Sequence, residues 1–164
     1  MRYKSIFFFT TFCFSEAQTL VRLFNRFEWQ EIAVLYYASR SNLIPRCSLV
    51  INDLEITLDN DRNMTLVYRK QFMNITNSTF RSALKSLKEV SRVIVVCLDS
   101  DEARRGFMIA VAEEEMDQNE YVWIMVESRR AGFKNIWVDT SPEPDGKDSL
   151  ALRAARKFLV VCHN

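Results

Sequence analysis

Two unbroken apolar runs, separated by one segment of helical length, constrain the fold of this chain more than any other feature. Residues 92–98 read RVIVVCL and residues 121–127 read YVWIMVE, and apart from charged end residues each run is apolar throughout. Residues 101–116 between them have the spacing of a helix, and residues 99–101 (Asp-Ser-Asp) offer it a cap. Continuously apolar strands joined by a helix are typical of a parallel sheet that is covered on both faces.

The same alternation of helix and strand extends along most of the chain. We predict helices at Glu16–Phe27, Pro45–Leu58, Thr79–Val90, Asp101–Met116 and Lys147–Arg156. We predict strands at Glu31–Tyr37, Thr65–Phe72, Arg92–Leu98, Tyr121–Glu127 and Lys157–Val161. This alternation favours an α/β fold with a doubly wound, mainly parallel sheet and helices on both faces. The first four strands would then take the flavodoxin-like order 2-1-3-4.

Length and composition place few other limits on function. At 164 residues the chain suits one domain with a substantial core. Its net charge of +1 gives no electrostatic reason to expect nucleic acid or an anionic membrane surface as a partner. The one break in composition is DTSPEPDGKD at residues 139–148, a polar loop with turn-forming residues. We therefore expect residues 18–138 to form the main domain and residues 139–164 to add this loop, a helix and a strand.

The first seventeen residues allow two interpretations. Residues 1–4 are basic, residues 5–14 are apolar, and small residues follow, which is the layout of a secretory signal peptide that ends near Ala17. Alternatively, Ser15 is the N-cap of the first helix, with Gln18 as its capping-box partner. Cleavage after Ala17 would remove that cap, so residues 1–17 cannot serve both purposes.

A ligand would bind where the predicted strands end. In open α/β sheets, ligands bind beyond the carboxyl ends of the strands. The residues at these ends are Tyr37, Ser39, Arg40, Asp99, Ser100, Glu127 and Arg129. Arg40 and Arg129 could hold an anion or a peptide carboxylate. Asp99 and Glu127 could hold a cationic group. The alternative interpretation is that each of these is a solvated loop charge.

Motifs for catalysis or for a bound cofactor are largely missing from the sequence. The only histidine, His163, is the penultimate residue, and there is no GxGxxG, Walker or CxxC motif. Residues 99–101 could bind magnesium as in an aspartate-nucleophile phosphatase, but a strand end followed by a helix cap is the simpler interpretation. We expect no metal, no cofactor and no enzymatic activity in this chain.

Several charged and aromatic residues have an ordinary structural interpretation. Arg104 and Arg105 are expected to cover the outer face of their helix, with packed stems and with their charged heads in water. The run Glu113–Glu115 is expected to be a solvated helix face. Trp29 and Trp123 follow or lie within apolar segments, so we expect both of them in the core.

Two of the four cysteines are candidates for a disulfide. If the strand order is 2-1-3-4, Cys47, early in the second helix, lies near the carboxyl end of the third strand, where Cys97 sits. A disulfide needs a Cα separation of roughly 4.4–6.8 Å, which the sequence alone does not fix. The expected places of Cys47 and Cys97 in the fold therefore allow either a disulfide or two buried free thiols.

Three N-glycosylation sequons lie close together and favour an extracellular domain. Their acceptors are Asn63, Asn74 and Asn77, in the tripeptides NMT, NIT and NST. All three lie in predicted loops, where a glycan would be exposed. The alternative for residues 77–79 is a polar turn in which Thr79 caps the next helix.

Three blocks of this sequence, in order, resemble the extracellular ligand-binding region of receptor-type guanylate cyclases. They read SEAQTLVRLFNRFEWQEIAVLYY, RVIVVCLDSDEARRGFMIAVAEEEMDQNEYVWIMVES and PDGKDSLALRAARKFLVV. The resemblance runs from about Ser15 to about Val161. It is nearest to the nematode chemosensory group, and more distantly similar to natriuretic peptide receptors. It implies one lobe, mainly the second, of a domain of the type I periplasmic binding protein kind.

The resemblance also implies a set of expectations about function. Cys47 and Cys97 fall where natriuretic receptors carry a bridged pair. The chain would bind an unknown small molecule, ion or peptide outside the plasma membrane, as part of a receptor homodimer or heterodimer. A membrane segment would lie outside this chain, and residues 139–164 would return toward a first lobe. Residues 1–17 would be either a signal peptide or an artefact of the gene model.

Two alternatives to the cyclase receptor stay open at this point. One is a stand-alone flavodoxin-like regulatory or hydrolase domain inside the cell. The other is the ligand-binding domain of a different receptor with the same periplasmic-binding-protein fold. The DGKD sequence at residues 145–148 favours the cyclase receptors, through the resemblance alone.

Overall fold

The computed structural model describes residues 15–38, 46–61, 63–127 and 135–162. Its helices are α1 (Glu16–Phe27), α2 (Arg46–Asp59), α3 (Asn77–Leu87), α4 (Asp101–Glu113) and α5 (Asp148–Ala155). Its strands are β1 (Glu31–Tyr37), β2 (Thr65–Gln71), β3 (Val93–Leu98), β4 (Val122–Glu127) and β5 (Phe158–Cys162). Helices and strands follow one another in the predicted order, and their ends differ from the prediction by a few residues.

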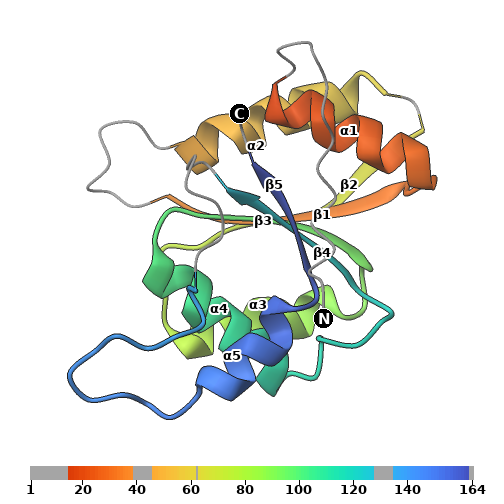
Figure 1. The fold of residues 1–164 in the computed structure, drawn as a ribbon. Helices are drawn as coiled ribbons and strands as arrows, with labels where there is room; N and C mark the ends of the chain where they lie inside the picture. Colours follow the sequence, from red (N-terminus) through yellow and green to blue (C-terminus); the bar gives the residue numbers. More distant parts are fainter. Residues whose placement is uncertain (1–14, 39–45, 62, 128–134, 163–164) are drawn as a thin grey trace.

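The five strands form one parallel sheet in the order β2-β1-β3-β4-β5. Helices α1 and α2 cover one face of the sheet, and α3, α4 and α5 cover the other (Figure 1). This arrangement confirms the predicted doubly wound α/β fold and the order 2-1-3-4 of the first four strands. β5 pairs with β4, where Phe158 lies opposite Trp123, so it extends this same sheet.

The pairing of β1 with β2 contains one irregularity. Ile32 lies opposite Leu66, but the next residue, Ala33, lies opposite Tyr68, so Val67 is an extra residue in β2. A one-residue insertion turns the side chains that follow it to the other face of the sheet. Leu66 accordingly packs with the core under α1 and α2, whereas Tyr68 packs with the core under α3, α4 and α5.

An aromatic cluster fills the space between the sheet and helices α3 to α5. The ring of Phe107, in α4, meets those of Phe80 and Trp123 edge to face, at centroid distances of 5.4 and 5.7 Å. Trp123 also stacks on Phe158 at 5.4 Å, and its indole nitrogen donates to the carbonyl of Met116 at 2.8 Å. Trp123 is fully buried, which agrees with the prediction. Edge-to-face and offset pairs of this kind add stability beyond the area that they bury.

Side-chain caps fix the first turns of three helices. Ser15 Oγ accepts a hydrogen bond from the amide of Gln18 at 3.2 Å, as the capping interpretation predicts. Ser100 caps α4 in the same way. α3 is capped by Thr76, whose hydroxyl accepts from the amide of Thr79 at 3.4 Å. The prediction of Thr79 as the cap is therefore wrong, because the helix begins earlier and Thr79 supplies the donor.

Two charged groups that were predicted to lie in solvent are buried, one within α4 and one at its C-cap. The side chains of Arg104 and Glu114 have only 1% and 7% of their area exposed. Glu114 accepts from Arg81 Nε of α3 at 2.6 Å, and this pairing lowers the pKa of its carboxyl. α4 lies between α3 and α5, which cover it on both sides (Figure 1). The predicted solvated face at Glu113–Glu115 is wrong, since within it only Glu115 is exposed.

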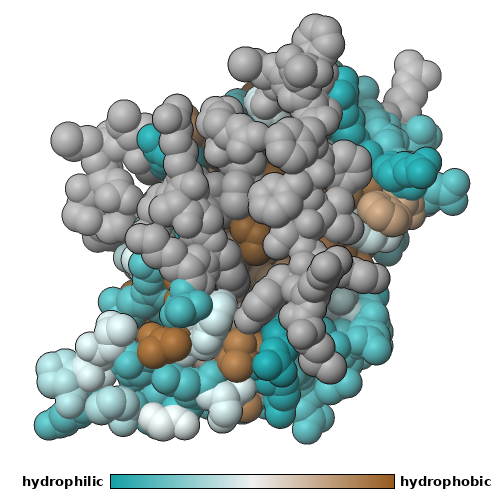
Figure 2. Space-filling model, in the orientation of Figure 1, coloured by the Kyte–Doolittle hydropathy of each residue, from teal (hydrophilic) through white to brown (hydrophobic). Residues whose placement is uncertain are grey.

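The described surface is mainly hydrophilic on the face shown in Figure 2, where apolar residues form small separate patches. The large apolar side chains that stay exposed are Phe27, Leu49, Ile56, Met73, Val90 and Val138. Within the described ranges, no helix is long and apolar enough to cross a membrane. Residues 1–14 of the predicted signal segment lie outside the described residues.

Candidate ligand-binding edge

The parallel sheet brings four of the predicted ligand-binding positions to one edge, namely Tyr37, Asp99, Ser100 and Glu127. Tyr37 ends β1 and lies opposite Leu98 of β3, which Asp99 follows in the chain. Glu127 ends β4, the neighbour of β3 on its other side. Both Tyr37 and Asp99 are half-buried, so they can contact a ligand at this edge. The other predicted features lie outside the described residues: Ser39, Arg40, Arg129 and the side chain of Glu127.

Ser100 already has a structural role at this edge. Its backbone is extended, with φ −128° and ψ 152°, and its Oγ accepts from the amide of Ala103 at 3.1 Å. Asp101 and Glu102 then place negative charge in the first turn, at the positive end of the helix dipole. Ser100 therefore holds the start of α4 in position, and a ligand would have to share its hydroxyl with the helix.

A buried cation lies directly behind this edge. Arg104 is one turn into α4, and its Nη1 donates to Asp101 Oδ1 at 2.9 Å. Burying a guanidinium is costly unless it is paired, so its position is tightly constrained. The burial of Arg104 could not be predicted, because nothing local in DEARRG distinguishes a buried arginine from a solvated one. Because Asp101 compensates its charge, Arg104 stabilises the first turn of α4.

A disulfide ties α2 to the carboxyl half of β3. Cys47 and Cys97 are bonded, with a Cα separation of 5.4 Å, and each has 1% of its area exposed. Cys97 lies opposite Tyr36 of β1, one position before the end of β3. The bridge therefore anchors the first turn of α2 close to the candidate edge. It confirms the predicted pair and excludes the alternative of two free thiols.

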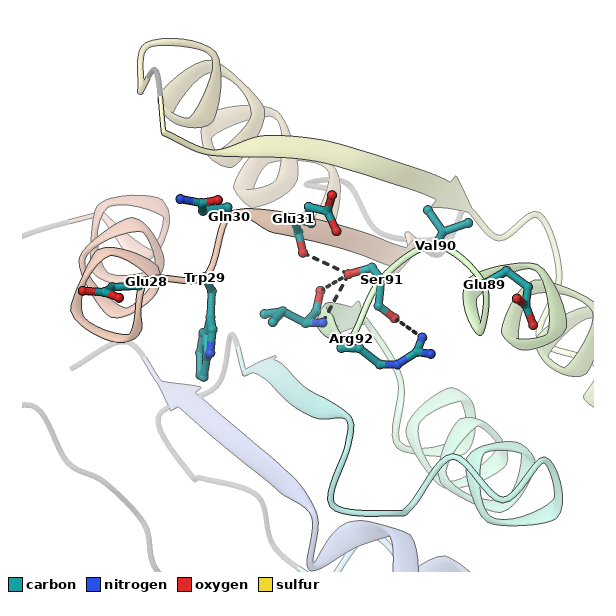
Figure 3. A pocket seen from close by; sticks show the side chains of 9 residues that line it. Glu28, Trp29, Gln30, Glu31, Glu89, Val90, Ser91 and Arg92 are labelled. Atoms are coloured by element: carbon teal, nitrogen blue, oxygen red, sulfur yellow. Dashed lines mark hydrogen bonds between the residues drawn. The ribbon is translucent and has the colours of Figure 1, made fainter.

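An open hollow of about 560 Å³ lies at the opposite edge of the sheet, where β1 and β3 begin. It is lined by Glu28, Trp29, Gln30, Glu31, Glu89, Val90, Ser91, Arg92 and Val93. Figure 3 shows the hydroxyl of Ser91, which lies 3.0 Å from the carbonyl oxygen of Glu31 and 3.1 Å from that of Val93. Trp29 is half-buried here: it packs against the core under α1 and α2 and stacks on Phe27, so it lies at the margin of the predicted core.

The carboxyl edge is the better candidate for ligand binding than this hollow. The hollow is wide open, and the polar group of Ser91 within it is engaged by the protein's own backbone (Figure 3). Parallel sheets bind ligands at their carboxyl ends, because there the loops diverge and the helices begin. The edge with Tyr37 and Asp99 meets this condition, whereas the hollow lies at the amino ends of the strands.

Comparison with known families decides which class of protein carries this edge. The sequence profile of the family described as "Receptor family ligand binding region" matches residues 1–163. The chain belongs to this family. The resemblance that the sequence analysis drew from three blocks is thereby confirmed, and the fold is the periplasmic-binding-protein-like α/β fold that it implied.

Curated relatives of this ligand-binding region are receptor-type guanylate cyclases of nematodes. Receptor-type guanylate cyclase gcy-5 of Caenorhabditis elegans is 29% identical over 166 residues, which cover 88% of this chain and 14% of the relative. Gcy-2 of the same species is 31% identical over 158 residues, which cover 85% and 14%. Gcy-4 of Caenorhabditis briggsae is 29% identical over 157 residues, with the same coverage. The chain thus spans only a small part of the length of these relatives.

An arginine clamp holds the polar loop of the ligand-binding region against α4. Arg105 forms two hydrogen bonds to the carboxylate of Asp145, at 2.6 and 2.7 Å. It also donates to Asp148 Oδ1 at 2.7 Å and, through Nε, to the carbonyl of Trp137 at 3.2 Å. The same Asp148 oxygen accepts from the amide of Asp139 at 2.9 Å. The clamp therefore joins the two ends of the loop to one side chain.

The clamp overturns the prediction that the head of Arg105 lies in water. Its side chain has only 13% of its area exposed. The Arg105 guanidinium, with the backbone amide of Lys147, holds the pKa of Asp145 far below its usual range, and Asp145 raises the pKa of Arg105 in turn. Asp145 is 40 residues away in sequence, so no local pattern around Arg105 could indicate this contact.

Replacing Arg105 should destabilise the fold in a pH-dependent way. Arg105→Gln should lower the free energy of unfolding at pH 7 by roughly 1–2 kcal/mol. This value lies toward the low end of the range for hydrogen bonds to charged groups, because Asp145 is partly exposed to solvent. The pKa of Asp145 is lowered by folding, so its stabilising effect is present above its ordinary pKa of 3.8 and is lost as pH falls below that value. The difference between wild type and variant should therefore shrink below about pH 4.

Urea unfolding curves at pH 7 and pH 3 measure this difference. Arg156→Gln is the matched control, since it removes a positive charge from an exposed position at the end of α5. It should change stability little at either pH. An equal loss of stability for Arg105→Gln at both pH values would show that the clamp does not depend on an ionised Asp145.

The three sequon asparagines are all exposed in the structure. Asn63 lies between α2 and β2, Asn74 lies between β2 and α3, and Asn77 is the first residue of α3. Nδ2 of Asn77 donates to Glu113 Oε2 at 3.0 Å. The exposure of these residues is compatible with glycosylation, which stays a prediction.

Proposed function

We propose that this chain is the ligand-binding part of a receptor guanylate cyclase and works on the outer side of the plasma membrane. The match of the family profile to residues 1–163 carries the proposal, and the names of the relatives support the receptor class. The buried disulfide supports an oxidising, extracellular compartment. In this function the chain senses a ligand and is not itself an enzyme. The cyclase that makes cGMP would lie elsewhere in a longer protein.

Ligand binding would act on an equilibrium between two arrangements of the receptor. A ligand shifts such an equilibrium only as far as its affinities for the two arrangements differ. We place the ligand, a small molecule, an ion or a peptide, at the carboxyl edge of the sheet. Its contacts would be Tyr37, Ser39, Arg40, Asp99, Ser100, Glu127 and Arg129. No cofactor takes part in this proposal.

The receptor would act as a homodimer or a heterodimer. The resemblance to natriuretic peptide receptors supplies a rival to the edge, because those receptors grip a peptide between two chains. A ligand between chains would contact a dimer face, whereas a ligand within one chain would contact Tyr37 and Asp99. Substitutions at the edge therefore separate these two modes of binding.

The test places this chain in a full-length receptor guanylate cyclase that is expressed in cultured cells. We expect antibody labelling of an epitope in the chain on intact cells, and a cGMP response to ligand. Asp99→Ala and Arg129→Ala should each change that response several-fold while surface labelling stays the same. The physical reason is that each substitution removes a charge that we place against the ligand.

Glu115→Ala is the control, because Glu115 is exposed at the other end of α4 from the edge. If Asp99→Ala and Arg129→Ala both respond like the wild type, the edge is not the ligand site and a dimer face becomes the better candidate. If intact cells show no surface labelling, the extracellular placement itself is wrong.

A further inference from the structure

A polar groove of about 320 Å³ separates β2, one of the two edge strands of the described sheet, from α3. It is lined by Tyr68, Lys70, Ser78, Thr79, Ser82, Ala83 and Ser86. The strand supplies an aromatic ring and a cation, and the helix supplies hydroxyl groups. The serines recur every fourth residue, so they lie along one side of α3.

Walls of this composition suit a sugar. A sugar ring has apolar faces that can lie against the flat ring of an aromatic side chain, and its rim carries hydroxyl groups that donate and accept hydrogen bonds. In the groove, Tyr68 offers the flat surface, and Ser78, Ser82 and Ser86 offer partners for the rim. Tyr68 faces the groove because the extra residue Val67 turns it to the α3 side of the sheet.

Asn74 lies at the mouth of this groove. It is exposed in the turn between β2 and α3, and it is the acceptor of one sequon. Its Oδ1 accepts hydrogen bonds from the hydroxyls of Thr79 at 2.5 Å and of Thr76 at 3.2 Å. Thr79 is itself a lining residue of the groove. The side chain of Asn74 is therefore fixed against the groove wall.

The three sequon asparagines differ in how they are held. Asn74 is held through its carboxamide oxygen, and its nitrogen is the atom that would carry a sugar. Asn77 uses that nitrogen to donate a hydrogen bond to Glu113 of α4, so the atom that would carry a sugar is already engaged by the protein. Asn63 lies in the loop before β2, where its backbone amide donates to Asp61. Asn74 is thus held by a hydrogen bond that its carboxamide oxygen accepts from the groove residue Thr79, whereas the carboxamide of Asn77 is held by Glu113.

We propose that the groove binds the first sugars of an N-linked glycan on Asn74. In the attachment step, a bond forms between Asn74 Nδ2 and C1 of an N-acetylglucosamine. The bond from C1 to the diphosphate of a lipid-linked donor breaks, and the amide proton leaves with the released diphosphate. The bound sugars then cover the outer side of β2 and join the strand to α3. This inference rests on the extracellular placement in the proposed function.

Hydrogen exchange of the secreted chain tests the proposal. The full chain is produced in glycosylating animal cells behind a cleavable leader, and mass spectrometry measures site occupancy and amide exchange. We expect exchange at residues 68–71 to be roughly tenfold slower with the glycan than in Asn74→Gln, because the sugars oppose local opening of the edge strand. Asn63→Gln is the matched control and should leave exchange at these residues unchanged.

A second variant tests the groove itself. Ser82→Arg places a long side chain in the groove and should restore fast exchange at residues 68–71 while Asn74 keeps its glycan. Equal exchange in wild type and Asn74→Gln, with Asn74 occupied, would overturn the proposal. An unmodified Asn74 beside a glycosylated Asn63 would overturn it as well. If no sequon carries a glycan on the secreted chain, this inference fails, whereas the extracellular placement is decided separately by the surface labelling of the full-length receptor.

Discussion

Replacing Phe107 by alanine should lower the free energy of unfolding by about 3–5 kcal/mol. Phe107 is fully buried and joins Phe80 of α3, Trp123 of β4 and Phe158 of β5 in one aromatic cluster. Its removal loses the transfer free energy of a large apolar side chain and leaves a cavity that rigid neighbouring rings cannot fill. Urea-induced unfolding followed by tryptophan fluorescence measures the loss.

Two further variants separate this effect from a general intolerance of substitution. Phe107→Leu keeps most of the volume and should cost less than about 2 kcal/mol. Phe27→Ala removes the same number of atoms from a side chain that is 49% exposed, so it should change stability much less. A loss for Phe27→Ala as large as that for Phe107→Ala would contradict the assignment of the cluster as the core of the fold.

Removing the Cys47–Cys97 disulfide should cost about 2–4 kcal/mol. The two cysteines are 50 residues apart, so the bridge restricts a long segment of the unfolded chain. Both side chains are buried, and we therefore expect Cys47→Ala/Cys97→Ala to lose packing as well. Unfolding in urea, with and without a reducing agent, measures the change.

The reducing agent provides the internal control for this experiment. It should lower the stability of the wild type toward that of the double variant and leave the double variant unchanged. Non-reducing peptide mapping of the secreted protein should recover Cys47 and Cys97 in one linked fragment. If both thiols can be alkylated in the folded wild type, the bridge does not form.

The fold could be predicted because its signals are local. The apolar runs of β3 and β4 each need only one strand length of sequence to be recognised, and Ser15 lies three residues from the amide that it caps. Strand order then follows from the few ways in which a parallel α/β sheet can be wound. The Cys47–Cys97 pair followed from that order, although the sequence alone did not exclude two free thiols.

Two of the errors arose where a residue meets a partner far away in sequence. Arg105 pairs with a loop 40 residues later, and Glu114 pairs with Arg81, 33 residues earlier. Each of these charges looks solvated within its own helix, because the pattern of α4 does not reveal that helices pack on both of its flanks. Burial of a charge is decided by that packing and by the presence of a partner.

The candidate site, like the fold, could be predicted only where the signals were local or followed from the topology. The topology of the sheet was sufficient to bring Tyr37 and Asp99 to one edge, since parallel strands end together. The role of Ser100 as a helix cap was also anticipated from its position after a strand. The groove beside α3 was not anticipated. Its serines, Ser78, Ser82 and Ser86, look like an ordinary polar helix face until Tyr68 is placed opposite them.

The extra residue Val67 divides β2 into two parts, in which the side chains at even-numbered positions point to opposite faces of the sheet. Before it, even-numbered positions such as Leu66 point toward α1 and α2; after it, even-numbered positions such as Tyr68 point toward α3. A strict period of two, read along the whole strand, would assign one half of β2 to the wrong side of the sheet. A deletion of Val67 would therefore restore a single alternation along β2 without moving the flanking side chains, because Leu66 and Tyr68 would become neighbours opposite Ile32 and Ala33 and keep their present sides of the sheet.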